Sequence, residues 1–179
     1  MKSETLFLLR RPTYVSINPR SLVKVPLDLI APPSNHPTGA ILLSALGDID
    51  GFAHTDLDQP SASGMYNPSH GNAWTIDVAW LKPYFVVRTH AGSPSASFAV
   101  DGGYNWTTFA RTPSGATGES PIAVSADASV IMWRGSWSND NGTTWTASTG
   151  LPSGSGGSNG ENPVADRVDP LKFYTGTFA

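Results

Sequence analysis

The sequence contains the same turn motif twice, and this repetition limits the folds that the chain can adopt. The motif reads S-x-D-x-G-x-x-W, and its two aspartates, Asp101 and Asp140, lie 39 residues apart. Blades of a β-propeller, each a small antiparallel sheet, repeat in the sequence every 40 to 50 residues or so. The spacing therefore predicts consecutive blades of a β-propeller.

Each residue type in the motif has a mechanical role in a tight turn. The aspartate accepts hydrogen bonds from backbone N–H groups, the glycine supplies a φ above zero, and the tryptophan packs between blades. The motif residues are Asp101, Gly103 and Trp106 in the first copy, where Ala99 replaces the serine, and Ser138, Asp140, Gly142 and Trp145 in the second. We interpret both copies, called Asp-box turns below, as structural rather than catalytic.

The composition and the hydrophobic pattern both favour strands. The chain has 179 residues with 18 Gly and 15 Pro, and only 14% of its residues are charged, which suits short strands joined by many loops. No stretch of useful length has the 3.6-residue period of a helix. Short apolar or alternating runs lie at 25–30, 41–46, 74–79, 84–89, 121–125 and 130–133. We predict an all-β fold, a β-propeller fragment of about two to three blades.

The repeats also predict how the chain is divided. Residues 1–25 show no repeat and form an unmatched lead-in, whereas residues 26–179 form a partial propeller that stops in mid-blade after the strand-like run 172–176. Because a closed propeller typically needs about four to eight blades, the end sheets should expose apolar surface. We expect the missing blades of a longer enzyme to cover it; assembly with copies of itself is the alternative.

Several kinds of function are disfavoured by composition. The chain has no cysteine, so disulfides and thiolate metal sites are excluded. The net charge is −3 and the only basic pair is Arg10-Arg11, so we expect no nucleic-acid partner. No apolar run approaches the length of a membrane span, and the N-terminus lacks a signal-peptide pattern. The four histidines lack metal-ligand spacing and are expected in surface or loop positions, so we predict neither a metal nor a cofactor.

The loop Ser44–Asp58, which contains Gly47-Asp48-Ile49-Asp50-Gly51-Phe52, carries a family resemblance. It resembles the segment that opens the second propeller of glycoside hydrolase family 74, the xyloglucanases and related reducing-end-specific cellobiohydrolases. Asp127 and the runs 131–133 and 166–174 follow in the family's order. The resemblance covers residues 25–179 and implies an extracellular enzyme with two seven-bladed propellers. Such enzymes cleave the β-1,4-glucan backbone of xyloglucan, a plant cell-wall polysaccharide, with inversion.

The resemblance places the family's general acid on Asp48. An inverting glycosidase also needs a general base, a second carboxylate that activates water on the opposite face of the sugar. The family's base lies in an Asp-Ile-Gly-Gly segment of the first propeller, which this chain lacks. We therefore predict little or no hydrolysis by the chain alone. Asp50 stands where many family members have glycine, and Asp50, Asp56 and Asp58 are expected to be solvated loop carboxylates.

Substrate contacts are expected from aromatic side chains. Trp133 and Trp137 are the candidates for a sugar-stacking platform, because indole rings stack on sugar faces, and Trp74, Trp80 and Tyr66 are weaker candidates. The alternative function is a non-catalytic propeller module that binds glycan or protein. Sortilin-like modules of this kind carry disulfides, which this chain cannot form, and a sialidase would need an arginine cluster that the sequence does not show.

Overall fold

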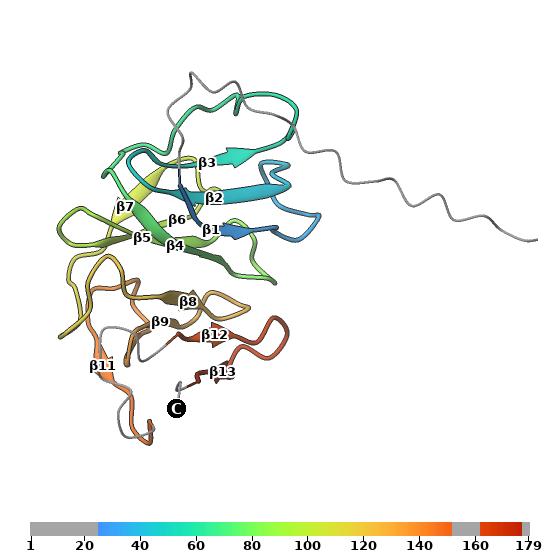
Figure 1. Ribbon diagram of the computed structural model, residues 1–179. Coiled ribbons are helices and arrows are strands. Elements are labelled where there is room, and N and C mark those ends of the chain that lie inside the picture. Colours follow the sequence, from blue (N-terminus) through green and yellow to red (C-terminus); the bar gives the residue numbers. More distant parts are fainter. Residues whose placement is uncertain (1–24, 152–161, 177–179) are drawn as a thin grey trace, which may run out of the picture.

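The computed structural model describes residues 25–151 and 162–176, and within these ranges all regular structure is β-strand (Figure 1). Almost the whole of the predicted lead-in and most of the Gly/Ser-rich connector that follows residue 150 lie outside the described residues. The prediction of an all-β fold is confirmed.

The strands form antiparallel meanders in chain order, because neighbours in the sequence are hydrogen-bonded neighbours in each sheet. The first sheet contains β1 (Pro26–Ile30), β2 (Leu42–Leu46) and β3 (Asp50–His54). The second contains β4 (Ala73–Val78), β5 (Val86–His90), β6 (Ala96–Ala99) and β7 (Trp106–Thr108). The third contains β8 (Ile122–Val124), β9 (Ile131–Trp133), β10 (Ser136–Ser138) and β11 (Thr146–Ala147), and the last pairs β12 (Val164–Ala165) with β13 (Phe173–Tyr174).

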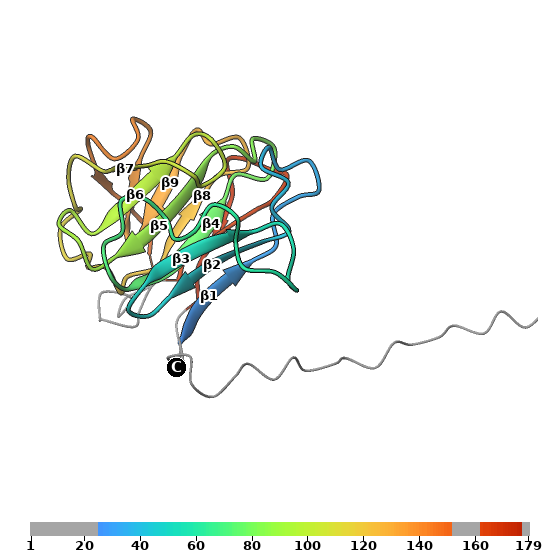
Figure 2. The same ribbon diagram turned by 90° about the horizontal axis from the view of Figure 1, so that it is seen from above.

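Successive sheets are stacked face to face, from β1–β3 at the top of Figure 1 to β12 and β13 at the bottom; Figure 2 shows the same stack from above. The first strands of the sheets are neighbours, since β1 packs against β4, β4 against β8 and β8 against β12. Sheets stacked through their first strands are the blades of a propeller. The described residues thus form a partial β-propeller of two four-stranded blades between a three-stranded and a two-stranded sheet.

Two apolar cores fill the spaces between the sheets. Strand β5 lies between them, so two consecutive residues of this strand, one for each core, are apolar. Side chains alternate between the two faces of a strand. Val86 therefore lies in the core shared with the first sheet, and Val87 lies in the core shared with the third. Trp106 and Trp145, the tryptophans of the Asp-box turns, pack in and against these same two cores. Removing the buried ring of Trp106 would cost about 3–5 kcal/mol.

The aspartates of the Asp-box turns accept hydrogen bonds within their own turns. Asp101 accepts the N–H groups of Tyr104 and Asn105 at 3.0 and 3.1 Å. Trp106 Nε1 donates to the carbonyl of Gly103 at 2.8 Å, which fixes the ring against the turn. Gly103 has a φ of 96°, in the region that glycine adopts without strain.

The second turn carries more hydrogen bonds because it has the serine that Ala99 replaces in the first. Ser138 Oγ donates to Asp140 at 2.8 Å and accepts the N–H of Gly142 at 2.9 Å. Asp140 also accepts the N–H of Thr144 at 2.9 Å and its hydroxyl at 2.6 Å. The hydroxyl of Thr144, followed by these other donors, lowers the pKa of Asp140 to about 2.

A second repeated aspartate joins neighbouring sheets, and the sequence analysis missed it. Asp28 on β1 accepts the N–H of Ile76 on β4 at 3.0 Å, and Asp77 on β4 accepts the N–H of Val124 on β8 at 2.9 Å. Burial raises the pKa of both carboxyl groups, against these hydrogen bonds. Arg167 also donates to Asp77 at 2.7 Å. Each aspartate satisfies a backbone donor of the next blade, and their 49-residue spacing was the signal available in the sequence.

The end sheets expose large apolar side chains. The exposed residues on or beside the first sheet include Val25, Leu27, Leu29 and Ile41, and those on or beside the last include Val164, Val168, Leu171 and Tyr174. In a propeller, such faces pack against the next blade.

Candidate functional site

The predicted acid, Asp48, lies on the turn between β2 and β3. Asp48 and Asp50 have φ values of 69° and 73°, in the left-handed region that aspartate tolerates better than most residues. Gly51 follows because a Cβ there would lie 1.9 Å from the carbonyl oxygen of Ser44. The Asp48 backbone N–H donates to Asn72 Oδ1, and the residue itself is exposed. The turn therefore presents one carboxylate to solvent on a tightly specified backbone.

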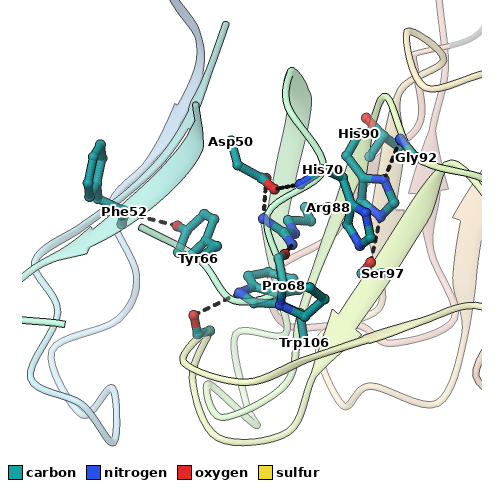
Figure 3. Close-up of polar contacts among 12 residues, drawn as sticks. Asp50, Phe52, Tyr66, Pro68, His70, Arg88, His90, Gly92, Ser97 and Trp106 are labelled. Carbon is teal, nitrogen blue, oxygen red and sulfur yellow. Dashed lines mark hydrogen bonds and ion pairs between the residues drawn. The ribbon is translucent and has the colours of Figure 1, made fainter. Parts of the chain in front are cut away.

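Asp50 is placed quite differently from the expected solvated carboxylate. It has 0% exposure, forms an ion pair with Arg88 and accepts the N–H of His70 at 2.7 Å (Figure 3). Burial raises the pKa of Asp50, while the Arg88 guanidinium and the His70 N–H oppose this shift. The expectation of a solvated carboxylate was therefore wrong for Asp50. Asp56 and Asp58 are exposed, as expected.

Arg88 is the buried centre of this cluster. Its Nη2 donates to the carbonyl of Pro68 at 2.8 Å, and its guanidinium lies 4.3 Å from the ring centroid of Trp106 and 5.0 Å from that of Tyr66. Burial lowers the pKa of Arg88 to about 10, so the group stays charged at neutral pH. The sequence signal was an arginine directly after the apolar run Tyr84–Val87, because a buried charge needs a partner.

Two histidines extend the cluster. The rings of His70 and His90 are stacked at 4.1 Å between centroids, and His90 is fully buried. His90 Nδ1 accepts the N–H of Gly92 at 3.1 Å, so its Nε2 carries the proton and donates to Ser97 Oγ at 2.5 Å. His36 is also buried. The expectation of surface or loop positions is therefore wrong for His90, which is buried on β5, whereas the buried His36 does lie in the loop between β1 and β2.

The two tryptophans predicted to stack on sugar differ in exposure. Trp133 has 0% exposure and donates from Nε1 to the carbonyl of Ser120 at 3.2 Å. A fully buried ring has no face to offer a sugar, so the structure does not support stacking by Trp133. Tyr66, a weaker candidate, is buried too, whereas Trp74 and Trp80 are half-buried. Trp137, on β10, is half-buried, with part of its surface accessible.

Other site types find little support in the described ranges. Within residues 25–151 and 162–176, no three histidine, aspartate or glutamate side chains come together in a way that could hold a metal ion. No helix long and apolar enough to cross a membrane is present in the same ranges. An open hollow of about 440 Å³ lies along the first strands, lined among others by Asp28, Thr75 and Arg167. Its carboxylates are those that join neighbouring blades.

Comparisons with known proteins identify what this architecture is similar to. No protein-family profile matches the chain. It is 39% identical over 160 residues to a xyloglucanase from Paenibacillus sp, a match that covers 83% of this chain and 15% of that protein. Xyloglucanase Xgh74A of Acetivibrio thermocellus is 34% identical over 152 residues, covering 83% and 17%. The crystal structure of the GH74 xyloglucanase from Xanthomonas campestris superimposes with a TM-score of 0.72 at 38% identity, covering 85% and 22%.

The stacked blades and the Asp-box turns define a β-propeller protein. The chain belongs to glycoside hydrolase family 74, as its sequence resemblance indicated. It spans about 15 to 17% of the length of the two curated relatives named above.

Proposed function

We propose that this chain is the acid-bearing part of a xyloglucan-degrading glycoside hydrolase, with Asp48 as general acid. The observation that carries the proposal is the turn itself: an exposed carboxylate in the family's Gly-Asp-x-x-Gly-Phe motif, on a backbone fixed by Asn72 and by the close contact at Gly51. The names of the relatives supply the substrate class, xyloglucan or another β-1,4-glucan. By the same resemblance, the enzyme would act outside the cell.

The chemistry assigned to Asp48 is proton donation to the departing glycosidic oxygen. Inverting glycosidases hold the acid and the base about 6.5–9.5 Å apart, which leaves room for a water molecule on the opposite face of the sugar. We assign the base to a part of the enzyme outside this chain, whose further blades would also cover the apolar end sheets. Residues 26–179 are then a partial propeller domain, and the chain alone binds glucan without cleaving it.

A chimaera tests this proposal directly. In the Paenibacillus xyloglucanase, the matching segment is replaced by residues 25–176 of this chain, and xyloglucan hydrolysis is measured. We expect an active chimaera whose kcat falls about 10²- to 10⁴-fold on Asp48→Asn, the usual contribution of a general acid. For an aryl glycoside with an acidic leaving group, kcat should fall much less on Asp48→Asn, because that leaving group departs without being protonated. Asp56→Asn, at an exposed loop carboxylate, is the matched control.

Two results would contradict the proposal. If the Asp48→Asn chimaera hydrolyses xyloglucan as fast as the unsubstituted chimaera, Asp48 is not the general acid. Robust hydrolysis by the purified 179-residue chain would show that the base lies within it. Affinity electrophoresis of the chain in xyloglucan gels gives the complementary measurement, with retardation and no cleavage expected.

A further inference from the structure

The buried Asp50–Arg88 ion pair lies beside the turn that carries Asp48, and its contacts give it a use beyond packing. We propose that Asp50 and Arg88 are positioning residues that hold the Asp48 turn in place from inside the molecule, with Trp106 of the first Asp-box turn holding Arg88. The importance of this device rests on the proposed acid role of Asp48, but its geometry does not.

Two hydrogen bonds close a ring between the Asp48 turn and the segment 70–72. The N–H of Asp48 donates to the side chain of Asn72, and the N–H of His70 donates to Asp50 at 2.7 Å. Asp48 on the turn and Asp50 at the start of β3 are two residues apart, and His70 and Asn72 are two residues apart on the other segment. The carboxylate of Asp50 therefore anchors the segment at His70. Asn72, two residues later on the same segment, accepts the N–H of Asp48.

Arg88 clamps the same two pieces of chain together. Nη1 of Arg88 pairs with Asp50 at the end of the turn, where β3 begins, and Nη2 donates to the carbonyl of Pro68 at 2.8 Å, just before the supporting segment (Figure 3). A planar guanidinium with two donors on one edge can bridge two acceptors in a fixed geometry, whereas the donors of the lysine ammonium rotate and have no such fixed plane. The clamp thus sets the distance between the turn and segment 68–72.

The first Asp-box turn forms the floor of this clamp. Trp106 lies 4.3 Å from the guanidinium, and its ring is fixed by the hydrogen bond to the Gly103 carbonyl. The Trp106 backbone N–H also donates to the carbonyl of Asn67 at 3.2 Å. The turn between β6 and β7 of the second blade therefore supports, through Arg88, the turn between β2 and β3 of the first. The repeat that builds the scaffold also orients the residue assigned to the chemistry.

Stability alone does not account for an ion pair at this place. Both side chains have 0% exposure, and well-packed apolar residues often replace a buried pair without loss of stability. What apolar residues cannot supply is an acceptor for the His70 N–H and a bridge to the Pro68 carbonyl. The specific contribution of the pair is therefore the geometry of the Asp48 turn.

Site-resolved amide hydrogen exchange of the full 179-residue chain tests the proposal by NMR. Asp50→Asn keeps the shape but replaces one acceptor oxygen with an NH₂ group. We expect the Asp48 amide to exchange about tenfold faster or more, because its hydrogen bond to Asn72 loosens. The matched control is Asp77→Asn, which alters the ion pair between the buried Asp77 and the half-buried Arg167 and should leave Asp48 exchange unchanged.

The proposal is overturned if the Asp48 amide exchanges at the same rate in the wild type and in Asp50→Asn. It is also overturned if Asp77→Asn accelerates this exchange as much as Asp50→Asn does, since both variants would then act through a general loss of stability. If Asp50→Asn does not fold, Arg88→Lys takes its place. This variant keeps the charge but loses the second guanidinium nitrogen, which donates to Pro68, and the same acceleration at Asp48 is expected. An unchanged rate in Arg88→Lys counts against the clamp. Neither measurement uses substrate, so failure of the acid role in the chimaera leaves this result standing.

Discussion

The buried histidine His90 makes the stability of this fold depend on pH in a way that can be calculated from the structure. Burial, followed by the nearby His70 and Arg88, lowers the pKa of His90 from its ordinary value to about 3. A protonated ring would also lose the hydrogen bond from the N–H of Gly92, because Nδ1 could no longer accept it. In the unfolded chain the same side chain takes up a proton near pH 6.5.

The sign follows from proton counting. Below about pH 6.5, His90 is protonated in the unfolded state but stays neutral in the folded state. The free energy of unfolding therefore falls as the pH falls, by about 1.4 kcal/mol per pH unit. This contribution is complete above that pH and declines until His90 itself protonates near pH 3. Between about pH 7 and pH 4.5, the fully buried His90 should therefore cost about 2–3 kcal/mol of stability.

The assay compares the wild type with His90→Gln by urea unfolding across this pH range. Glutamine can accept from Gly92 and donate to Ser97 but does not titrate. Burial raises the pKa of Asp28, Asp50 and Asp77, which acts in the opposite direction, but this effect is common to both proteins and cancels. We expect the wild type to lose about 2–3 kcal/mol more than His90→Gln on acidification. Parallel pH profiles for the two proteins would refute the reasoning.

Three further changes test other parts of the fold and site. Gly51→Ala should destabilise the fold by about 3 kcal/mol or more, because its Cβ would meet the Ser44 carbonyl. Chemical unfolding measures this loss, and the control Gly176→Ala, which has open space around it, should leave the stability unchanged. Asp140→Asn should lower the melting temperature at neutral pH, and this difference should vanish as the pH falls toward 2, where wild-type Asp140 protonates; a difference that persists there argues against the carboxylate. Trp137→Ala should weaken retardation in xyloglucan gels without changing the melting temperature, because its ring is only half-buried; unchanged retardation removes it from the glucan site.

The repeated turn carried most of what could be predicted about the fold. The hydrogen bonds of such a turn are local, so the turn can be recognised from a few adjacent residues. The 39-residue spacing of its two copies, at Asp101 and Asp140, then indicated propeller blades. The loop resemblance then assigned the family, and the relatives agree with it.

The buried polar groups could not be predicted in this way. Asp50 looks like one of several loop aspartates, and only Arg88, 38 residues later, makes its burial possible. Trp133 and Trp137 lie four residues apart on the adjacent strands β9 and β10, yet Trp133 is fully buried and Trp137 is half-buried. Burial depends on which sheet covers each face, and that is decided by the stacking of blades rather than by the strand itself.

The sequence by itself thus determined the blade period, the all-β class, the turn residues and the family, because each depends on residues close together in the chain. The tertiary structure alone decided which charges are buried and what they hold. Contacts between residues far apart, such as Asp50 with Arg88 and Arg88 with Trp106, form only when the blades are stacked. The first Asp-box turn therefore has two roles in this protein: its local hydrogen bonds shape a hairpin, and Trp106 supports the turn that carries Asp48.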